Sequence, residues 1–208
     1  MSLRNTSGRT AGRERVDTVL DTLQQTDEEL AAEAAREGSD GPAFVALVER
    51  FRQRVWRICY RLLGNEADAS DAAQEVFVRL FLHRAKFDGR SKYATWAHSI
   101  AVRTCLSIRR GRGRRAKHET TASDEQLEST GASDAHGAPA SGDRLSMDAM
   151  TVLEDLDEVD RALLILKYAE SYSYEELAAM FDLSVSACKM RVSRARDKVQ
   201  ERHGPSMQ

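Results

Sequence analysis

Proline and aromatic residues are scarce in this chain of 208 residues, which has three prolines and 6% Phe, Trp and Tyr together. Alternating runs of β-branched residues, the pattern of half-buried strands, are also missing, whereas Leu, Ala, Val, Arg and Glu form long stretches. Few helix breakers and few strand formers favour helices throughout. The sequence therefore predicts an all-α protein.

Cysteine is equally sparse, because Cys59, Cys105 and Cys188 are the only three and lie far apart. An odd, scattered set excludes a disulfide framework, and each cysteine falls within a helical apolar pattern that favours a buried structural thiol. No Cys-x-x-Cys pair is present, and the five histidines, at positions 83, 98, 118, 136 and 203, do not cluster as zinc ligands do. We expect neither a metal nor a cofactor.

Long apolar runs are missing as well, so no stretch is long enough to cross a bilayer. The N-terminal stretch MSLRNTSGRTAGRER lacks the apolar segment of a signal peptide. We therefore expect a cytoplasmic protein with no membrane partner. Enzyme chemistry has little support, because no Ser/His/Asp order, phosphate-cradling glycine loop or pair of acids stands out. No catalytic residue is assigned.

Charge is balanced in number, with 31 Lys and Arg against 33 Asp and Glu, but the two signs lie in different blocks. The near-neutral total argues against a protein that coats nucleic acid indiscriminately. The stretch RRGRGRRAK at 109–117 is basic enough to neutralise several phosphates. Residues 118–143 are rich in Ser, Thr, Ala, Gly and acids, and cannot bury enough apolar surface to fold alone. We interpret them as a flexible acidic linker between two small helical domains.

Start signals locate the first helices of the first domain. Residues 1–25 are expected to form a mobile tail, after which Thr26 and Glu29 make a capping box that opens a short helix. Pro42 suits the first turn of a long helix over 43–63, where its missing N–H costs nothing. That helix has an apolar stripe at the helical period, and its opposite face is charged, with Glu49, Arg50, Arg52, Arg54, Arg57 and Arg61.

Gly64 is placed to end the long helix, and Asn65 to cap the next one, over 67–83. A further helix is expected from 95 to about 110, where it runs into the basic stretch.

The segment between the last two helices mixes cations with aromatic residues. It contains Asp88-Gly89, which breaks the helical period, together with Arg84, Lys86, Phe87, Arg90, Lys92 and Tyr93. Such a mixture favours bound single-stranded nucleic acid, since bases stack on rings while phosphates meet the charges. An ordinary loop with two core aromatics fits the same residues, so the loop alone does not decide.

The stretch from Ser173 to Lys198 predicts two short helices joined by a tight turn. Ser173 and Glu176 form a capping box, and Ser184 can cap a second helix over 185–198. The second helix is basic, whereas the chain just before the motif is acidic. This asymmetry suits a helix-turn-helix whose second helix faces DNA phosphate, although a run of Lys and Arg is also an ordinary solvated surface.

Three stretches of this chain, taken in order, resemble the extracytoplasmic-function group of sigma-70-type RNA polymerase sigma factors. ADASDAAQEVFVRLF (67–81) is similar to the group's region 2 signature, YATWAHSIAVRTCLSIRR (93–110) to the helix after it, and YEELAAMFDLSVSACKMRVSRARDKV (174–199) to its region 4 reader. The resemblance implies a region 2 domain over 26–115, a linker over 116–146 and a region 4 domain over 147–203.

The resemblance also implies a function: a promoter-specificity subunit that binds core RNA polymerase, recognises the minus-ten and minus-thirty-five elements, and helps to open the DNA. The implied partners are the clamp helices of the largest polymerase subunit, the flap of the second-largest subunit, promoter DNA as duplex and as single strand, and an anti-sigma factor. The acidic linker would thread toward the polymerase cleft and mimic nucleic-acid charge.

Site residues carry over from the family by motif. For core polymerase they are Asp71, Gln74, Glu75 and Phe77. For the minus-ten element they are Lys86, Phe87, Arg90, Lys92, Tyr93, Trp96, Arg103, Arg109 and Arg110. For the minus-thirty-five element they are Ser184, Ser186, Ala187, Lys189, Arg191, Arg194 and Arg196. The simpler interpretations are a solvated helix face for the charged residues and core packing for Phe77 and Trp96.

Several positions depart from the family pattern. This chain has Arg103, Ser107 and Ser70 where the family often has Asn, Asp and Glu, and Ala187-Cys188 where Thr-Val is frequent. Phe181-Asp182 replaces the Leu-Gly that usually makes the turn, and Asp tolerates the same left-handed conformation better than most residues. These departures concern promoter preference. The alternative is a free-standing helix-turn-helix regulator, in which the first domain would dimerise or sense a ligand.

Overall fold

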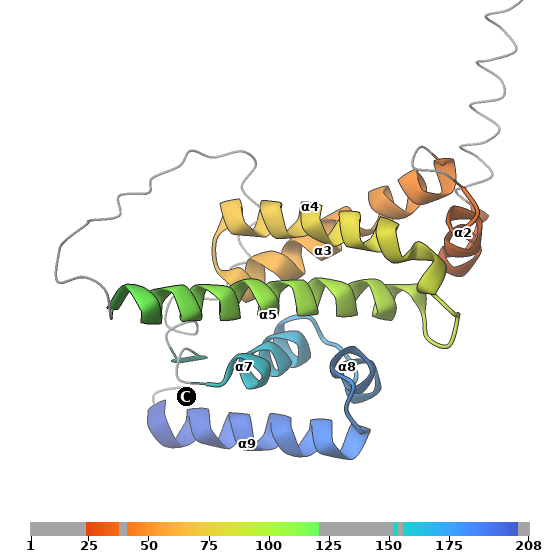
Figure 1. Ribbon diagram of the computed structural model, residues 1–208. Helices are drawn as coiled ribbons and strands as arrows, with labels where there is room; N and C mark the ends of the chain where they lie inside the picture. Colours follow the sequence, from red (N-terminus) through yellow and green to blue (C-terminus); the bar gives the residue numbers. More distant parts are fainter. Residues whose placement is uncertain (1–23, 38–40, 121–151, 154–155, 204–208) are drawn as a thin grey trace, which may run out of the picture.

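The computed structural model describes residues 24–37, 41–120, 152–153 and 156–203, with the backbone alone for 115–120 and for residue 203. Its elements are α2 (Asp27–Ala34), α3 (Pro42–Leu63), α4 (Glu66–His83), the 3₁₀ turn η1 (Arg84–Lys86), α5 (Tyr93–Thr120), α7 (Glu158–Leu164), the π-helical η2 (Ile165–Ala169), α8 (Tyr174–Phe181) and α9 (Val185–His203). Every regular element in these ranges is helical, which confirms the all-α prediction (Figure 1). The tail over 1–23 and the linker over 121–146 lie outside the described residues.

Local sequence signals begin and end the helices where they were expected. Thr26 and Ser173 both complete capping boxes, with Glu29 and Glu176 respectively. Pro42 occupies the first turn of α3, and Gly64 ends that helix with φ 86°. The side chain of Asn65 accepts from the backbone N–H of Asp68 at 2.8 Å and caps α4, while that of Ser184 accepts from the N–H of Ala187 at 3.1 Å and caps α9. Asp182 ends α8 at φ 56°, which confirms the left-handed turn predicted there.

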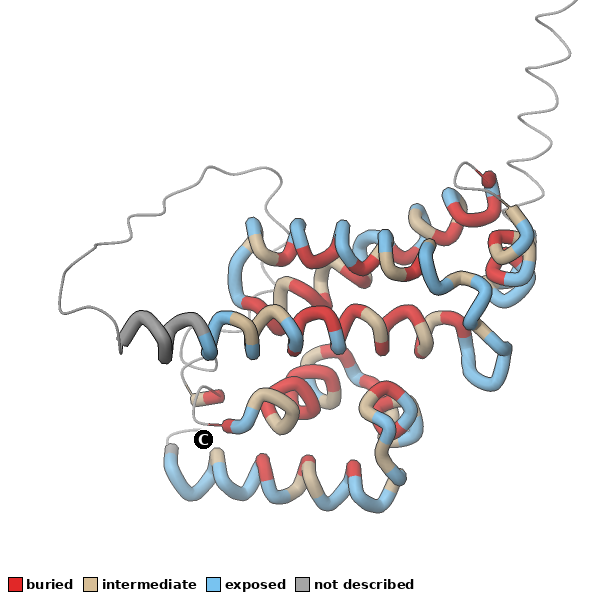
Figure 2. The backbone as a smooth tube through the Cα atoms, viewed as in Figure 1, coloured by how far each residue is buried: buried red, intermediate tan, exposed pale blue. Residues whose placement is uncertain are grey.

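Helices α2 to α5 form the first domain, a bundle built on the apolar stripe of α3. Leu47, Phe51, Val55 and Ile58 are buried at the helical period, and small residues of α4 such as Ala69 and Ala72 let α3 and α4 pack closely. In Figure 2, the red turns of α3, α4 and α5 lie where these helices meet. Cys59 of α3 and Cys105 of α5 are both free and buried, in agreement with structural thiols.

Helix α5 is longer than the sequence predicted. It begins at Tyr93, two residues early, and continues to Thr120, past the expected end near Arg110 and into the first residues assigned to the linker. Each glycine in a helix interior costs about 1 kcal/mol relative to alanine, and α5 contains two beyond Arg110. Between the two glycines, the guanidinium of Arg112 donates to the carboxylate of Asp68, so this part of α5 still contacts α4.

Helices α7 to α9 form the second domain. The buried guanidinium of Arg161 donates from Nε to the carbonyl of Leu153 at 2.8 Å, which fixes the chain that enters α7. Leu163, Leu166 and Leu177 supply the core, and α9 packs on it through Cys188, Val192 and Ala195.

The two domains pack against each other rather than standing apart. Helix α5 contacts both α7 and α8, and α3 contacts η2. In Figure 1, α5 lies between α3 and α4 on one side and α7 and α8 on the other, with α9 farthest from the first domain.

Candidate nucleic-acid interface

A cluster of three aromatic rings stands at the start of α5. The rings of Phe87 and Tyr93 are 5.3 Å apart, those of Phe87 and Trp96 5.6 Å, and those of Tyr93 and Trp96 5.5 Å. Tyr93 is buried against Phe51, and burial, followed by the charge of Asp27, raises the pKa of its hydroxyl. Phe87 and Trp96 are only half-buried. Tyr93 is therefore a core residue, while Phe87 and Trp96 each keep an accessible part.

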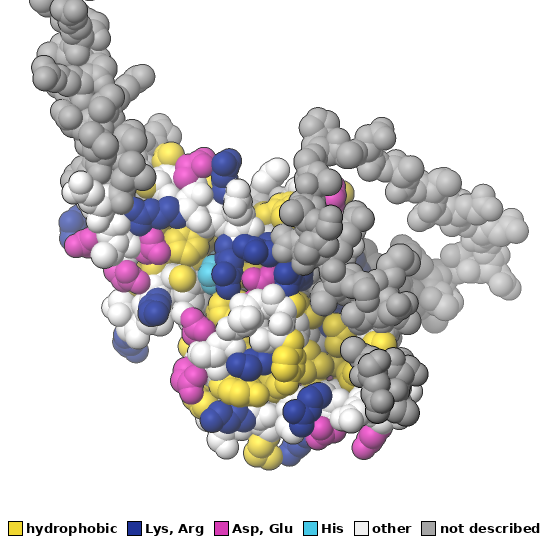
Figure 3. Space-filling model, turned by 180° about the vertical axis from the view of Figure 1, so that it is seen from behind, with side chains coloured by type: hydrophobic (Ala, Val, Ile, Leu, Met, Phe, Trp, Pro, Cys, Tyr) yellow, Lys and Arg dark blue, Asp and Glu magenta, His cyan; other side chains and the backbone are white. Residues whose placement is uncertain are grey.

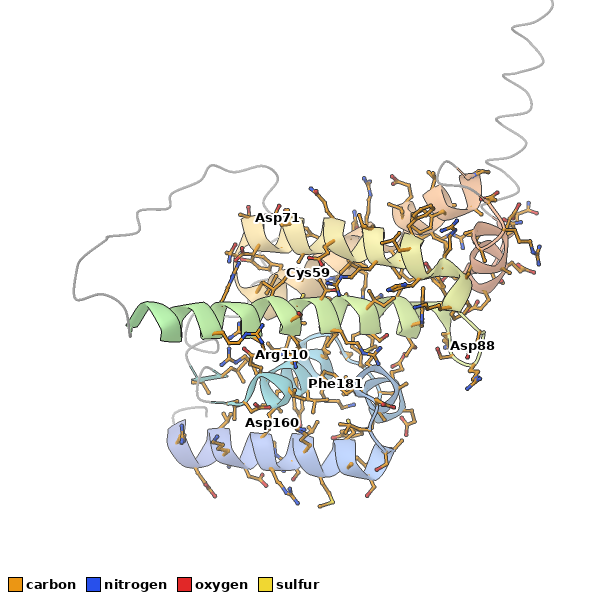
Figure 4. All side chains as sticks on the ribbon, viewed as in Figure 1. Cys59, Asp71, Asp88, Arg110, Asp160 and Phe181 are labelled. Atoms are coloured by element: carbon orange, nitrogen blue, oxygen red, sulfur yellow. The ribbon has the colours of Figure 1, made fainter. Side chains whose placement is uncertain are left out.

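Exposed cations surround these rings. Lys86, Arg90 and Lys92 are exposed on a loop that turns at Gly89 with φ 72°, and the Arg90 guanidinium lies 2.9 Å from the carboxylate of Asp88. Figure 4 shows this loop, marked by Asp88, at the outer edge of the first domain. Half-exposed rings flanked by exposed positive side chains suit a bound single strand, because rings stack bases and cations meet phosphates.

The arginines further along α5 divide into two kinds. Arg103 and Arg110 are exposed, and Figure 4 places Arg110 on the side of α5 that faces the second domain. Arg109 is half-buried, since its guanidinium donates to the carbonyl of Leu62 at 3.0 Å and lies 3.8 Å from the carboxylate of Glu158 on α7. Arg109 thus holds structure together, whereas the other two are accessible.

The outer side of α4 is a separate polar face, which points away from α5 and from the second domain (Figure 4). Asp71, Gln74 and Glu75 are exposed on it, and Glu75 accepts from Nη2 of Arg79 at 2.5 Å. Phe77 is half-buried and packs against the core.

Two apolar residues extend the outer face of α4 and were missed from the sequence. Val78 is 57% exposed and Leu82 is 65% exposed. Both follow Asp71 at helical spacing, seven and eleven residues on, so the period of the face was the signal that could have found them. The outer face of α4 therefore offers acids at one end and apolar side chains at the other.

The outward face of α9 carries most of the residues predicted to read duplex DNA. Ser184, its cap, is exposed, and so are Ser186, Ala187, Lys189, Arg194 and Arg196. The sequence prediction omitted Met190, which is 52% exposed on the same face. The side chains at this end of α9 are small, polar or cationic, and one is apolar and exposed. This combination matches the chemistry of a major groove, where thymine presents a methyl group.

Arg191 is oriented differently from the other cations of α9. Its guanidinium turns inward to α7, where it lies 3.0 Å from the carboxylate of Asp157 and pairs with that of Asp160. Asp160 lies between α7 and α9 in Figure 4. Arg191 also borders a hollow of about 440 Å³ together with Leu183 and Met190. Arg191 therefore joins α9 to the rest of the second domain.

Within the residues that the structure describes, no group of three or more His, Cys, Asp and Glu side chains is arranged to hold a metal ion. Over the same residues, every helix is too short or too polar to span a membrane.

Comparison with known proteins decides the family. The model of "Sigma-70 region 2" matches residues 47–115 and that of "Sigma-70, region 4" matches residues 146–199, so the two together cover more than half of the chain. The ECF RNA polymerase sigma factor SigW of Bacillus subtilis is 28% identical over 172 residues, which are 78% of this chain and 89% of SigW. The chain is an extracytoplasmic-function member of the sigma-70 family.

Two solved structures, one of them of a sigma factor, have the same fold. CnrH, solved with the cytosolic domain of CnrY, has a TM-score of 0.60 at 24% identity, over 86% of this chain and 97% of CnrH. RpoE of Bartonella quintana, solved with the anti-sigma factor NepR, has a TM-score of 0.56 at 24% identity, over 76% of this chain and 94% of that one.

Membership makes this sigma factor a promoter-specificity subunit of bacterial RNA polymerase, which binds core enzyme and promoter DNA. The alternative, a free-standing helix-turn-helix regulator, is not favoured, because the region 2 match covers the helices for which such a regulator has no use.

Proposed function

We propose that the sigma factor binds core polymerase through the outer face of α4 and opened minus-ten DNA through the loop and aromatic rings at the start of α5, while α9 reads the minus-thirty-five duplex. The observation that carries this proposal is the exposure of all three surfaces, each with the chemistry its partner requires. The sigma factor supplies binding and no catalysis, and it acts where polymerase and DNA are, in the cytoplasm.

On the outer face of α4, Asp71, Gln74 and Glu75 offer carboxylates and an amide to a basic helical partner, and Val78 and Leu82 offer apolar area. Interfaces of this kind combine an apolar centre with polar contacts around it. We assign this face to the clamp helices of the largest polymerase subunit, and the second domain, outside the outward face of α9, to the flap of the second-largest subunit.

At the minus-ten element, Phe87 and Trp96 would stack unpaired bases while Lys86, Arg90 and Lys92 meet the backbone. Stacking of a base on an aromatic side chain contributes about 1–3 kcal/mol, which can offset the cost of unstacking a flipped base. Arg103 and Arg110 would extend the same strand path along α5.

At the minus-thirty-five element, the first turns of α9 enter the major groove. Ser186, Ala187 and Lys189 stand closest to base edges, and Arg194 and Arg196 meet phosphates. Arg191, held by Asp157 just before α7 and by Asp160 within it, orients the helix instead of reading bases.

Occupation of both elements requires the domains to separate. The two elements lie about 25 base pairs apart, which is about 85 Å of duplex at 3.4 Å per step. In the structure, α8 and α9 belong to a domain that rests on α5. The packed arrangement is therefore a form of the free protein, distinct from the form on the promoter. CnrH and RpoE were solved with CnrY and with the anti-sigma factor NepR. We infer that an anti-sigma factor also controls this protein.

Transcription in vitro tests the function. Purified sigma factor and core polymerase are incubated with fragments of the source genome, and start sites are mapped with each component omitted in turn. We expect discrete starts that need both components. Lys189→Ala should reduce transcription from these starts while its affinity for core polymerase stays that of wild type. Arg52→Ala, which removes an exposed cation of α3, is the control and should leave transcription unchanged. Tight binding of a palindromic duplex by the protein alone, without starts, would favour the regulator instead.

A further inference from the structure

One carboxylate of the second domain is buried in the first. Glu170 follows η2, and its side chain is only 4% exposed because it inserts beside α3. Its oxygens lie 3.4 Å from Nε of Arg54, 3.9 Å from Nε of Arg57 and 3.0 Å from Nε of Arg61. The three arginines lie on one side of α3, at spacings of three and four residues. Burial of a carboxylate is costly unless cations compensate its charge, and the arginines of α3 compensate Glu170 only while the two domains are in contact.

Backbone groups strengthen the same contact. Arg54 donates from Nη2 to the carbonyl of Glu170 at 3.3 Å, and Arg61 donates from Nη1 to the carbonyl of Ala169. Two arginines of α3 thus bind both the side chain and the main chain of one short segment.

Two residues further on, a second polar contact crosses the interface. The hydroxyl of Tyr172 lies 2.7 Å from Nδ1 of His98 on α5, and both residues are 4% exposed. The guanidinium of Arg54 stands 5.2 Å from the centre of the Tyr172 ring. Among the described residues, no group hydrogen-bonds to the other ring nitrogen of His98, Nε2. His98 is therefore placed in the interface by Tyr172.

The backbone of this segment is unusual, and its conformation aims both side chains at the first domain. Residues Ile165–Ala169 form a π-helical turn, and Ser171, between Glu170 and Tyr172, has φ 58°. Non-glycine residues adopt such a conformation only where their surroundings hold it. Here the N–H of Tyr172 donates to the carbonyl of Leu166 at 3.2 Å, and Lys167 donates to the carbonyl of Tyr172 at 2.9 Å. π-Turns are frequent at functional sites.

Closure places acids of the second domain next to the residues proposed for the minus-ten strand. Ser91, Lys92 and Thr95 share a hollow of about 470 Å³ with Ser173, Glu175, Glu176 and Ala179 of the second domain. Farther along the domain interface, the carboxylate of Glu158 on α7 lies 3.8 Å from the guanidinium of Arg109 on α5. Seen from behind, positive and negative side chains lie side by side across the middle of the molecule (Figure 3). A phosphate backbone on this side of α5 would meet carboxylates.

We propose that Glu170 and Tyr172, held by Arg54, Arg57, Arg61 and His98, form an interdomain clasp that keeps the free sigma factor closed and shields the α5 side of its minus-ten surface from DNA. The inference rests on the proposed function for what is shielded, but the clasp itself is a property of the free protein. The outward faces of α4 and α9 stay accessible in the closed form. Polymerase and a duplex can therefore bind first, and release of the clasp then admits the single strand.

Distance between the domains in the free protein tests the clasp without polymerase. A dye pair is attached to cysteines introduced at Glu49 and Gln200, since both positions are exposed and the native cysteines are buried. Single-molecule energy transfer then counts closed and open molecules. We expect wild type to be mainly closed, and Glu170→Gln to lower the ratio of closed to open molecules at least tenfold. Asp197→Asn, which removes an exposed acid of α9 in the same domain, is the matched control and should leave the ratio unchanged.

Charge exchange separates the clasp from a folding defect. Glu170→Arg should open the protein, and the double variant E170R/R61E should restore part of the closed population, with helix content unchanged by circular dichroism. A wild type that is already open, or an E170R variant as closed as wild type, would overturn the clasp.

Binding of a labelled 20-nucleotide mixed-sequence single strand to the free protein tests the shielding. Glu170→Gln should bind the strand several-fold more tightly than wild type. If energy transfer shows that this variant is more open than wild type but the two bind the strand equally well, the shielding is refuted. Failure of promoter-dependent transcription, by contrast, concerns the proposed function and leaves the distance measurement unaffected.

Discussion

Two rows of arginines in this molecule look alike in sequence and differ in use. Arg54, Arg57 and Arg61 on α3 converge on one buried carboxylate of the other domain, whereas Arg194 and Arg196 on α9 are exposed. From the sequence alone, the α3 row resembles an ordinary solvated face and the α9 row a DNA-binding face. The difference shows that a cation's role is decided by the carboxylate that meets it, which can be far away in the sequence.

Removal of the whole α3 row should have the largest effect. The triple variant R54A/R57A/R61A leaves Glu170 with no cation to compensate burial, and should cost the closed form about 3 kcal/mol, at the low end for a broken buried pair because Arg54 and Arg57 are partly exposed. Hydrogen exchange of α7 and α8 would report the loss as faster exchange. The pair R194A/R196A on α9 is the control, and if it accelerates exchange equally, the two rows do not differ.

A cation that faces DNA should matter more for transcription than one that faces acids. Lys189→Ala should lower promoter-dependent initiation about tenfold, as for loss of a base or phosphate contact of about 1–3 kcal/mol. Arg191→Ala should lower initiation less but reduce the melting temperature of the second domain, because it unpairs Asp157 and Asp160. Transcription and melting curves measured on the two variants in parallel would separate them. The reverse ranking would place Arg191 on the DNA.

The closed form should weaken in mild acid. Burial, and then the charge of Arg54, lower the pKa of His98 from 6.5 to about 4. Tyr172 and the Phe51 ring face the same imidazole, and burial raises the pKa of the Tyr172 hydroxyl to about 12, so that group stays neutral. Closure therefore requires neutral His98, and it is favoured above pH 6.5 and lost progressively as the pH falls toward 4.

Between pH 7.5 and 5.5 the ratio of closed to open molecules should fall about tenfold, since the open form binds a proton that the closed form excludes. Energy transfer across this range gives the ratio. His98→Gln should flatten the pH dependence, and a slope that survives this substitution would mean that another group is titrating.

The smallest effect is expected at Met190. Met190→Ala removes exposed apolar area from the outward face of α9 and should change initiation only a few-fold, with the change confined to promoters that carry thymine at one position of the minus-thirty-five element. A library of promoters randomised across that element would show it. A uniform loss across all sequences would assign Met190 to packing.

Features set by residues close in sequence were predictable here. The capping boxes at Thr26 and Ser173, the stop at Gly64 and the left-handed turn at Asp182 each depend on a few neighbouring residues, and all are present. The helical spacing of the Lys and Arg residues in α9 also predicted that this face is charged and exposed. Whether those residues bind DNA stays a prediction.

Features set by distant residues were not predictable. Beyond Arg110, α5 contacts α4 through Arg112 and Asp68, which are 44 residues apart. The orientation of Arg191 depends on acids 31 and 34 residues away, and the Arg54 contact with Glu170 spans 116 residues. No local pattern encodes such pairs, because either partner alone looks like a solvated charge.

Helix α5 has a mechanical consequence. At 1.5 Å per residue, its 28 residues make a rod about 42 Å long, with the loop proposed to bind the minus-ten element before its first turn and the connection to the second domain after its last. When the domains part, the second domain stays attached at the end of this rod that is remote from the loop. The covalent connection therefore leaves the loop end of α5 unrestrained, so α8 can move away from the proposed strand path while the loop keeps its place in the first domain.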